Sequence, residues 1–169
     1  KSIYPNAFID ILAAFIERGS SLCRNGYLGA LTSRACLYTK TLEKWRNTTY
    51  LPAVEIVGDL GGGVLDGAMV FACASVLRLP ESQSTNTYTI DLRTSDTPST
   101  DLVRALEALS RGQSAEYLYS TGRVKYYQSP ASRYLYNIPD SFWRWTQTGR
   151  TLSSEGGSAR AGSTTYDDF

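Results

Sequence analysis

The sequence contains no histidine among its 169 residues, and this absence excludes several kinds of active site at once. A Ser-His-Asp triad, a Cys-His dyad and the usual zinc sites cannot be built without an imidazole. Cysteine is scarce as well, and the three cysteines show no C-x-x-C spacing. An odd number of isolated cysteines in apolar surroundings predicts buried free thiols. They are Cys23, Cys36 and Cys73.

Long apolar runs and a strong net charge are missing too. No segment reaches the roughly eighteen consecutive apolar residues of a membrane-spanning helix, so we expect no membrane partner. The 17 basic and 16 acidic residues give a net charge of +1. This balance neither requires nor excludes a nucleic-acid partner, because a local basic patch can bind a polyanion. Hydrophobic residues make up 42% of the chain, which is ordinary for one folded domain.

Apolar residues recur at helical spacing in four segments of the chain. The third segment is apolar almost all round and ends before Pro80, which predicts a buried helix. A short extended piece lies at 50–57, and a long polar loop at 81–100 contains one predicted strand at 87–92. The sequence therefore predicts an all-α antiparallel four-helix bundle with a small distal β element and a long polar inner loop. The four predicted helices are residues 8–23, 32–45, 64–79 and 99–112.

The composition changes towards the carboxyl end. Residues 115–147 are rich in tyrosine and tryptophan, for which core packing is favoured over a base-stacking platform. Beyond Gly149 the chain is rich in serine and glycine and poor in apolar residues. We therefore expect a bundle domain over residues 1–148 and a solvated surface tail over residues 149–169.

Three consecutive glycines stand in the stretch Val57–Met69, VGDLGGGVLDGAM. The run resembles the phosphate loop of the sugar-kinase, heat-shock and actin superfamily, but that fold needs two lobes, each about the size of this chain. There is also no G-K-[ST] motif, which excludes a Walker loop. The favoured interpretation is that Gly61–Gly63 gives the backbone freedom for a tight strand-to-helix turn. A small phosphate- or nucleotide-binding enzyme, with Asp59 and Asp66 holding a metal and phosphate, remains the alternative.

Several charged residues invite a functional interpretation. Three arginines lie at the ends of the third and fourth predicted helices, where they are either plain surface residues or a set of guanidinium groups for phosphate oxygens. Glu43 and Asp66 have simple structural accounts, on a solvated helix face and in a first helical turn. The three arginines are Arg78, Arg93 and Arg104.

Short stretches in a shared order carry a family resemblance over roughly residues 8–148. With these stretches placed on four helices, the sequence resembles the coat proteins of rod-shaped plant RNA viruses of the tobacco mosaic virus type. The stretches are Leu22–Asn25, Arg34 with Glu43–Trp45, Val64–Asp66, and Tyr136–Asn137 with Phe142 and Trp145–Thr146.

The resemblance implies a structural protein, not an enzyme, that assembles with itself into a helical rod around single-stranded RNA in the virion and the host cytoplasm. Arg78, Arg93 and Arg104 would contact phosphates. Glu43 and Asp66 would form an intersubunit carboxylate pair, a pH and cation switch that takes up a proton or a cation such as calcium. Asp91 and Asp101 would form a second set. A monomeric helical-bundle binding domain is the remaining alternative.

Overall fold

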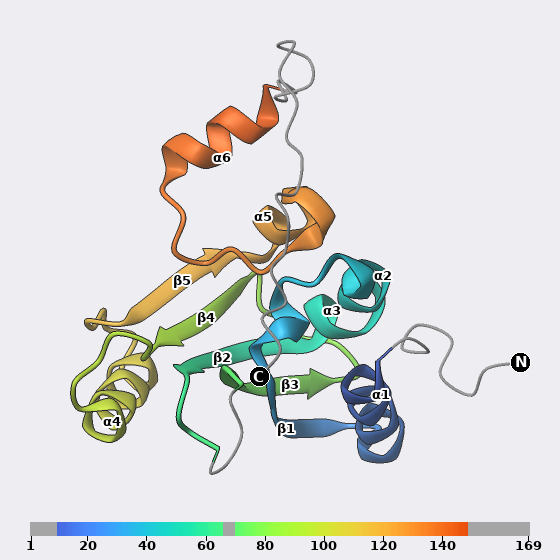
Figure 1. Cartoon of the computed structure of the whole chain (residues 1–169), viewed down its shortest axis with the longest axis horizontal. Helices are drawn as coiled ribbons and strands as arrows, with labels where there is room; N and C mark the ends of the chain where they lie inside the picture. Colours follow the sequence, from blue (N-terminus) through green and yellow to red (C-terminus); the bar gives the residue numbers. More distant parts are fainter. Residues whose placement is uncertain (1–9, 66–69, 149–169) are drawn as a thin grey trace, which may run out of the picture. The chain divides into compact units, whose positions relative to one another are not determined.

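The computed structural model describes residues 10–65 and 70–148 and has a five-stranded mixed sheet at its centre (Figure 1). The strand order is β1-β3-β2-β4-β5, with β2 and β4 parallel and the other neighbours antiparallel. The protein is therefore an α/β fold, and the predicted all-α four-helix bundle is wrong. The strands are β1 (Gly26–Ser33), β2 (Val54–Gly61), β3 (Ala72–Leu79), β4 (Asn86–Asp91) and β5 (Leu118–Gly122).

In the described part of the chain, only three helices reach seven residues: α1 (Ile11–Cys23), α4 (Pro98–Ser110) and α6 (Asp140–Gln147). None of the helices among these residues is long and apolar enough to span a bilayer. The chain divides into two compact units, Lys1–Asn137 and Ile138–Phe169, and the whole sheet belongs to the first. The predicted tail at 149–169 lies outside the described residues. The shorter helices are α2 (Glu43–Trp45), α3 (Leu51–Ala53) and α5 (Arg123–Gln128).

The predicted third helix is wrong because its second half is the strand β3, which lies between β1 and β2 in the sheet. Residues of β3 alternate between two sheet faces: Cys73 and Leu77 point into the main core, whereas Arg78 is exposed. Because every residue of β3 except Arg78 is at least partly buried, its sequence is an almost continuous apolar run. Such a run cannot be distinguished from a buried helix by periodicity alone.

The predicted second helix is also wrong, because the segment from Ser33 to Ala53 is broken into short turns. β1 ends at Ser33, whose hydroxyl accepts from the Ala35 N–H and caps a 3-10 turn at Arg34–Leu37. A second 3-10 turn, Lys40–Leu42, and a π-helical turn, Arg46–Tyr50, follow. The apolar residues of this segment are buried as predicted, but not along one helical face.

Three predicted elements are confirmed. α1 begins after Asp10, whose carboxylate caps the helix by accepting from the Leu12 N–H at 2.9 Å. β4 coincides with the strand predicted at 87–92, to within one residue. α4 coincides with the fourth predicted helix, although it begins after Thr97 rather than at a capping Ser99 or Thr100.

Two hydrophobic clusters cover the two faces of the sheet. The larger cluster contains α1 side chains, the turns after β1, and buried tyrosines, of which Tyr126 and Tyr134 stack with ring centroids 4.2 Å apart. The smaller cluster packs Ala105 of α4 against Ile90 and Leu92 on the other face of β4. The aromatic residues from Tyr126 to Tyr136 are thus mainly core, as the sequence favoured.

A fully buried arginine holds the irregular segments of the large cluster together. The guanidinium of Arg46 donates to the backbone carbonyls of Cys36, Thr39, Ala131 and Ser132, at 2.7 to 2.9 Å. These segments lie in turns whose carbonyls have no strand partners, and four charge-assisted hydrogen bonds satisfy them. The Arg46 guanidinium is therefore a structural group.

Candidate ligand-binding site at the carboxyl edge of the sheet

Three strands end on the same edge of the sheet and bring charged residues together there. β1 and β2 both run antiparallel to β3, and β4 runs parallel to β2, so β1, β2 and β4 point the same way (Figure 1). Arg34 follows β1, Asp59 lies near the end of β2, and Asp91 ends β4 as the register partner of Asp59. In α/β sheets, ligands bind outside the carboxyl ends of such strands.

Asp59 is the buried centre of this edge. Its Oδ2 accepts from the Arg34 Nε at 2.6 Å and from the Tyr136 hydroxyl at 2.8 Å, and the Arg93 Nε lies 3.5 Å away. The side chain is completely buried, and its Oδ1 has no hydrogen-bond partner among the described residues. A buried carboxylate oxygen without a donor costs free energy, and such sites normally hold a water or a ligand group.

Arg93 forms a second, bidentate pair with Asp91. Its Nε donates to Asp91 Oδ1 at 2.8 Å, and its Nη2 donates to Oδ2 at 2.7 Å. Two guanidinium groups thus face two carboxylates, and the four charges compensate each other. The side chains of Arg34 and Arg93 remain 25% and 30% exposed, so both cations are in reach of a ligand from the solvent side.

The pKa values at this edge follow from burial and from these contacts. Burial raises the Asp91 pKa, but the hydrogen bonds from Arg93 outweigh it and hold the pKa below its ordinary value. Burial alone would lower the Arg34 pKa, but the hydrogen bond to Asp59 and the nearby acidic groups raise it. Burial raises the pKa of Tyr38 to about 12. Both arginines are therefore charged and Tyr38 is neutral at physiological pH.

A pocket of about 480 Å³ opens between the glycine turn and the start of α4. Gly62 and Gly63 form one wall, Ser95 and Ser99 form the other, and Arg93 lies between them. Gly63 has φ +74°, a left-handed conformation that glycine adopts without strain. Among the described residues no side chain caps the N-terminus of α4. Pro98 has no N–H, so the backbone donors of its first turn begin at Ser99, which lines this pocket.

A second pocket of about 250 Å³ is lined by residues that include Arg34, Tyr38 and Phe71. The Phe71 ring is 61% exposed, and its Cε1 lies 3.7 Å from where a Cβ on Gly62 would stand. Its carbonyl accepts from the Arg34 N–H at 2.7 Å. The Arg34 guanidinium in turn lies 4.5 Å from the centre of the Tyr38 ring. The second pocket is therefore lined by two aromatic rings and a cation.

Of the charged residues proposed from the sequence, the structure brings Asp59, Asp91 and Arg93 into this site. Arg78 lies near the opposite end of β3 and faces Glu55, 3.9 Å away. Arg104 is 74% exposed on α4 and lies 3.6 Å from Asp101.

The other predicted carboxylates are spread over the chain. The Asp101 carboxylate accepts hydrogen bonds from the hydroxyls of Ser95 and Thr97, and these bonds stabilise the start of α4. Glu43 is half-buried in α2, and Asp66 lies outside the described residues, so their pairing and a calcium ion between them stay predictions. Within residues 10–65 and 70–148 no three potential metal-ligating side chains cluster.

The sequence alone does not place Asp59 beside Arg34 and Tyr136, and it gives no functional signal for Phe71. Asp59 and Asp91 come at the ends of two parallel strands, a relation that is visible only once both strands are assigned. Phe71 was placed inside a predicted buried helix, where an aromatic residue is ordinary. The feature of the sequence that points to this site is a repeated pattern in which an apolar strand is followed by a charged residue.

The comparisons with known proteins include a distant structural likeness. No protein family matches the chain, and no curated protein is significantly similar. One similar solved structure is the methyltransferase subunit of a type I restriction-modification system from Streptococcus thermophilus, with 12% identity and a TM-score of 0.45. The match covers 60% of this chain and 24% of that one, so the chain spans about a quarter of that protein's length. A likeness at this level carries no inference about activity.

The resemblance to rod-shaped virus coat proteins is wrong, and with it the assignment as a structural coat protein. The stretches that carried it fall on different elements: Arg34 follows a strand, and Val64 and Leu65 lie in the connection between two strands rather than at the start of a helix. The coat-protein assembly depends on a helical bundle, which the mixed sheet replaces. The expectations of an RNA partner, of self-association and of no enzymatic activity are untested and stay predictions.

Proposed function

We propose that the carboxyl edge of the sheet binds a small phosphate-bearing ligand of the nucleotide type. This proposal develops the alternative that the sequence left open for Gly61–Gly63. The observation that carries it is that one pocket joins a glycine turn, the uncapped start of a helix and an arginine. Backbone N–H groups at a helix N-terminus, together with a guanidinium, are a common way to bind phosphate oxygens.

The second pocket accounts for the ring of such a ligand. An exposed phenylalanine has no structural role in packing, but it offers a flat apolar face beside Arg34 and Tyr38. Base stacking on an aromatic side chain contributes about 1–3 kcal/mol and tolerates different bases. Since Phe71 lies near Gly62, which lines the first pocket, a phosphate in the first pocket and a ring in the second can belong to one molecule.

The charges of the site set a limit on the ligand. Arg34 and Arg93 are already compensated by Asp59 and Asp91, so the net attraction for an anion comes chiefly from the α4 dipole and the glycine-turn amides. Asp101, in the first turn of α4, offsets part of that dipole. We therefore expect a singly phosphorylated ligand to bind better than a triphosphate.

The test is calorimetric titration of the purified chain with inorganic phosphate, adenosine, adenosine monophosphate and adenosine triphosphate. We expect the monophosphate to bind most tightly, because it alone fills both pockets without excess charge. Phe71→Ala should weaken the monophosphate about tenfold and leave phosphate unchanged, since about 1.4 kcal/mol of stacking is a factor of ten. Absence of binding by all four probes contradicts the proposal.

Two variants of Gly62 with side chains of the same size test whether the ligand group in the first pocket carries a negative charge. Gly62 has no left-handed backbone and an added Cβ meets only ordinary contacts, so Gly62→Asp and Gly62→Asn should both fold. The two side chains have the same size, but only aspartate repels an anion in the pocket. Loss of binding in Gly62→Asp, with partial binding retained in Gly62→Asn, supports a phosphate there. Equal loss in both assigns the pocket to a neutral group instead.

A further inference from the structure

Two of the three cysteines meet in the main core, beside β1. The Sγ atoms of Cys36 and Cys73 lie 3.8 Å apart, although the two residues are 37 positions apart in the chain. Both side chains are completely buried, and both are free thiols. Cys36 lies in the Arg34–Leu37 turn. Cys73 lies in β3, where its register partner in β1 is Thr32. The sulfur atoms of a disulfide are about 2 Å apart, so a further approach of less than about 2 Å separates these thiols from a bond.

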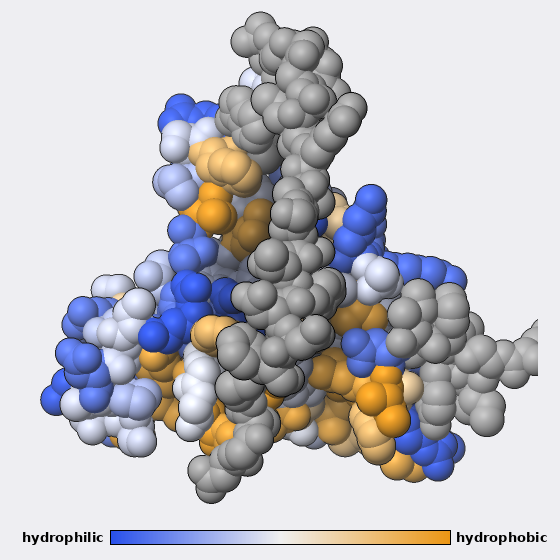
Figure 2. All heavy atoms as spheres, in the orientation of Figure 1, coloured by the Kyte–Doolittle hydropathy of each residue, from blue (hydrophilic) through white to orange (hydrophobic). Residues whose placement is uncertain are grey.

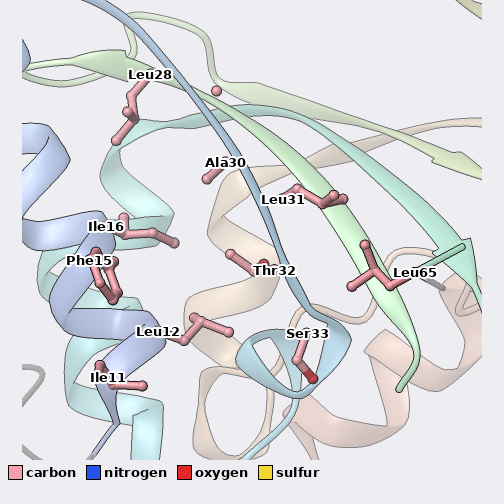
Figure 3. A pocket seen from close by; sticks show the side chains of 11 residues that line it. Ile11, Leu12, Phe15, Ile16, Leu28, Ala30, Leu31, Thr32, Ser33 and Leu65 are labelled. Carbon is pink, nitrogen blue, oxygen red and sulfur yellow. The ribbon is translucent and has the colours of Figure 1, made fainter. Parts of the chain in front are cut away.

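A surface groove leads to the two thiols. Hydrophobic side chains gather over α1 and β1 (Figure 2), and a groove of about 510 Å³ lies between these two elements (Figure 3). Thr32 is one of the residues that line the groove, and its Oγ1 lies 3.3 Å from Cys73 Sγ and 3.7 Å from Cys36 Sγ. Thr32 therefore borders both the groove and the thiols. Hydrogen peroxide is small and uncharged, so the apolar walls of the groove do not exclude it.

The contacts of the two sulfur atoms give them different reactivity. The hydrogen bond with Cys36 lowers the pKa of the Cys73 thiol, and a hydrogen bond with Thr32 adds to this effect, so that the pKa is below its ordinary value despite burial. The same hydrogen bond with Cys73, together with burial, raises the pKa of the Cys36 thiol well above its ordinary value. Because the thiolate is the nucleophile in thiol oxidation, Cys73 is the attacking sulfur and Cys36 is the protonated thiol beside it.

We propose that Cys36 and Cys73 are a reversible dithiol–disulfide pair, which hydrogen peroxide oxidises in the folded chain. Cys73 Sγ attacks one oxygen of the peroxide, the O–O bond breaks, and the other oxygen leaves as water with the proton of the Cys73 thiol. Cys73 is then a sulfenic acid. Cys36 Sγ attacks this sulfur, the S–O bond breaks, and the hydroxyl leaves as a second water with the Cys36 proton. Two thiols are oxidised to one disulfide while one peroxide is reduced to two waters.

The disulfide joins the two segments that line the second pocket of the candidate site. Arg34 stands two residues before Cys36, and Phe71 stands two residues before Cys73. Both Arg34 and Phe71 line that pocket, and the Arg34 N–H donates to the Phe71 carbonyl at 2.7 Å. Oxidation therefore fixes the Arg34–Leu37 turn against β3. The regulation of ligand binding that follows rests on the proposed function, whereas the chemistry of the thiol pair does not.

Peptide mapping tests the pairing, because trypsin releases the three cysteines on three different peptides. These are residues 19–24, 35–40 and 47–78, which contain Cys23, Cys36 and Cys73. The folded chain is treated with hydrogen peroxide, unfolded in urea with iodoacetamide to block the remaining thiols, and digested. We expect peptides 35–40 and 47–78 to be joined, with a mass lower than their sum by two hydrogen atoms, and neither to be joined to 19–24.

The matched control is the same chain oxidised in urea, where no tertiary structure selects the partners. Peptide 19–24 should then be joined to the other two as well, since Cys23 and Cys36 are close in sequence. Alkylated Cys36 and Cys73 after peroxide treatment of the folded chain would overturn the proposal. So would the same mixture of pairings in the folded and the unfolded chain.

Urea denaturation measures what the bond does to the fold. A cross-link between distant positions restricts the unfolded chain, so the urea midpoint should rise by about 1 M on oxidation and return after dithiothreitol. Cys36→Ser cannot form the bond and should show no such rise; each chain is compared with itself before and after peroxide. A disulfide that leaves the midpoint unchanged overturns the fixing of the turn. No ligand is present, so the nucleotide proposal and this one can fail separately.

Discussion

Two edges of the sheet depart from the usual rule that apolar side chains are buried and polar side chains are exposed. They are the carboxyl edge of β2 and β4 and the free edge of β1, and they depart from this rule in opposite ways. At the carboxyl edge, polar groups are buried: Asp59 is completely enclosed, and one of its oxygens has no partner within residues 10–65 and 70–148. At the β1 edge, apolar groups are exposed, among them Phe15 and Leu31. In a single chain, the Asp59 oxygen without a donor and the exposed apolar side chains are both unfavourable. The ligand proposed above would supply a donor at the first edge.

The largest expected effect comes from breaking the buried charge cluster. Asp59→Ala removes the acceptor of Arg34 and Tyr136 and leaves two guanidinium groups without their shared partner. We expect the free energy of unfolding to fall by about 3–5 kcal/mol, as for other buried pairs that lose one member. Urea denaturation measures it. The control Glu107→Ala, on the exposed face of α4, should change it by less than about 0.5 kcal/mol, and equal effects would mean that Asp59 is not central.

A smaller loss in the free energy of unfolding is expected when only one hydrogen bond to the Asp59 carboxylate is removed. In Tyr136→Phe the ring keeps its packing, but Asp59 Oδ2 loses the phenolic donor at 2.8 Å. Hydrogen bonds to charged groups contribute about 1.5–3 kcal/mol, so the loss should be in that range and below that of Asp59→Ala. A Tyr119→Phe control removes a hydroxyl from an exposed ring and should have no effect. An unchanged free energy of unfolding in Tyr136→Phe would show that the hydrogen bond from Arg34 is sufficient for the Asp59 carboxylate.

The pH dependence of the free energy of unfolding also distinguishes the two edges. The carboxyl edge carries carboxylates that take up protons at acidic pH, whereas β1 has none. The Asp91 pKa in the folded chain lies below the ordinary value of 3.8, despite burial, because Arg93 donates to it. Asp91 therefore contributes stability that is present above the unfolded pKa and is lost as the pH falls through the lower, folded pKa. Urea midpoints measured from neutral to strongly acidic pH should fall more steeply in wild type than in Asp91→Asn. Identical slopes would contradict this assignment.

The smallest effect is expected at the β1 edge. Leu31→Thr exchanges an exposed apolar side chain for one with high strand propensity. The free energy of unfolding, measured by urea denaturation, should change by less than about 0.5 kcal/mol. A large loss would mean that Leu31 already packs within its own chain.

Elements with strong local signals could be predicted from the sequence. Asp10 and the apolar spacing of α1 define a helix without reference to the rest of the chain. The alternation of β4, bounded by polar loops, likewise predicted a strand. The candidate site was only partly predictable: Gly61–Gly63 was recognised as a turn, but the turn connects β2 to β3 rather than to a helix.

The amino-acid sequence by itself determined which residues would be apolar, where the chain would turn, and that histidine-dependent and imidazole-zinc sites could not form. The tertiary structure alone decided that Val54–Gly61 and Ala72–Leu79 are neighbouring strands, and that Arg34, Asp59, Asp91 and Arg93 meet at one edge. The physical reason is that helical periodicity is a local property, whereas strand pairing joins residues far apart in the chain. A buried strand hydrogen-bonded on both sides loses the alternation that would have revealed it.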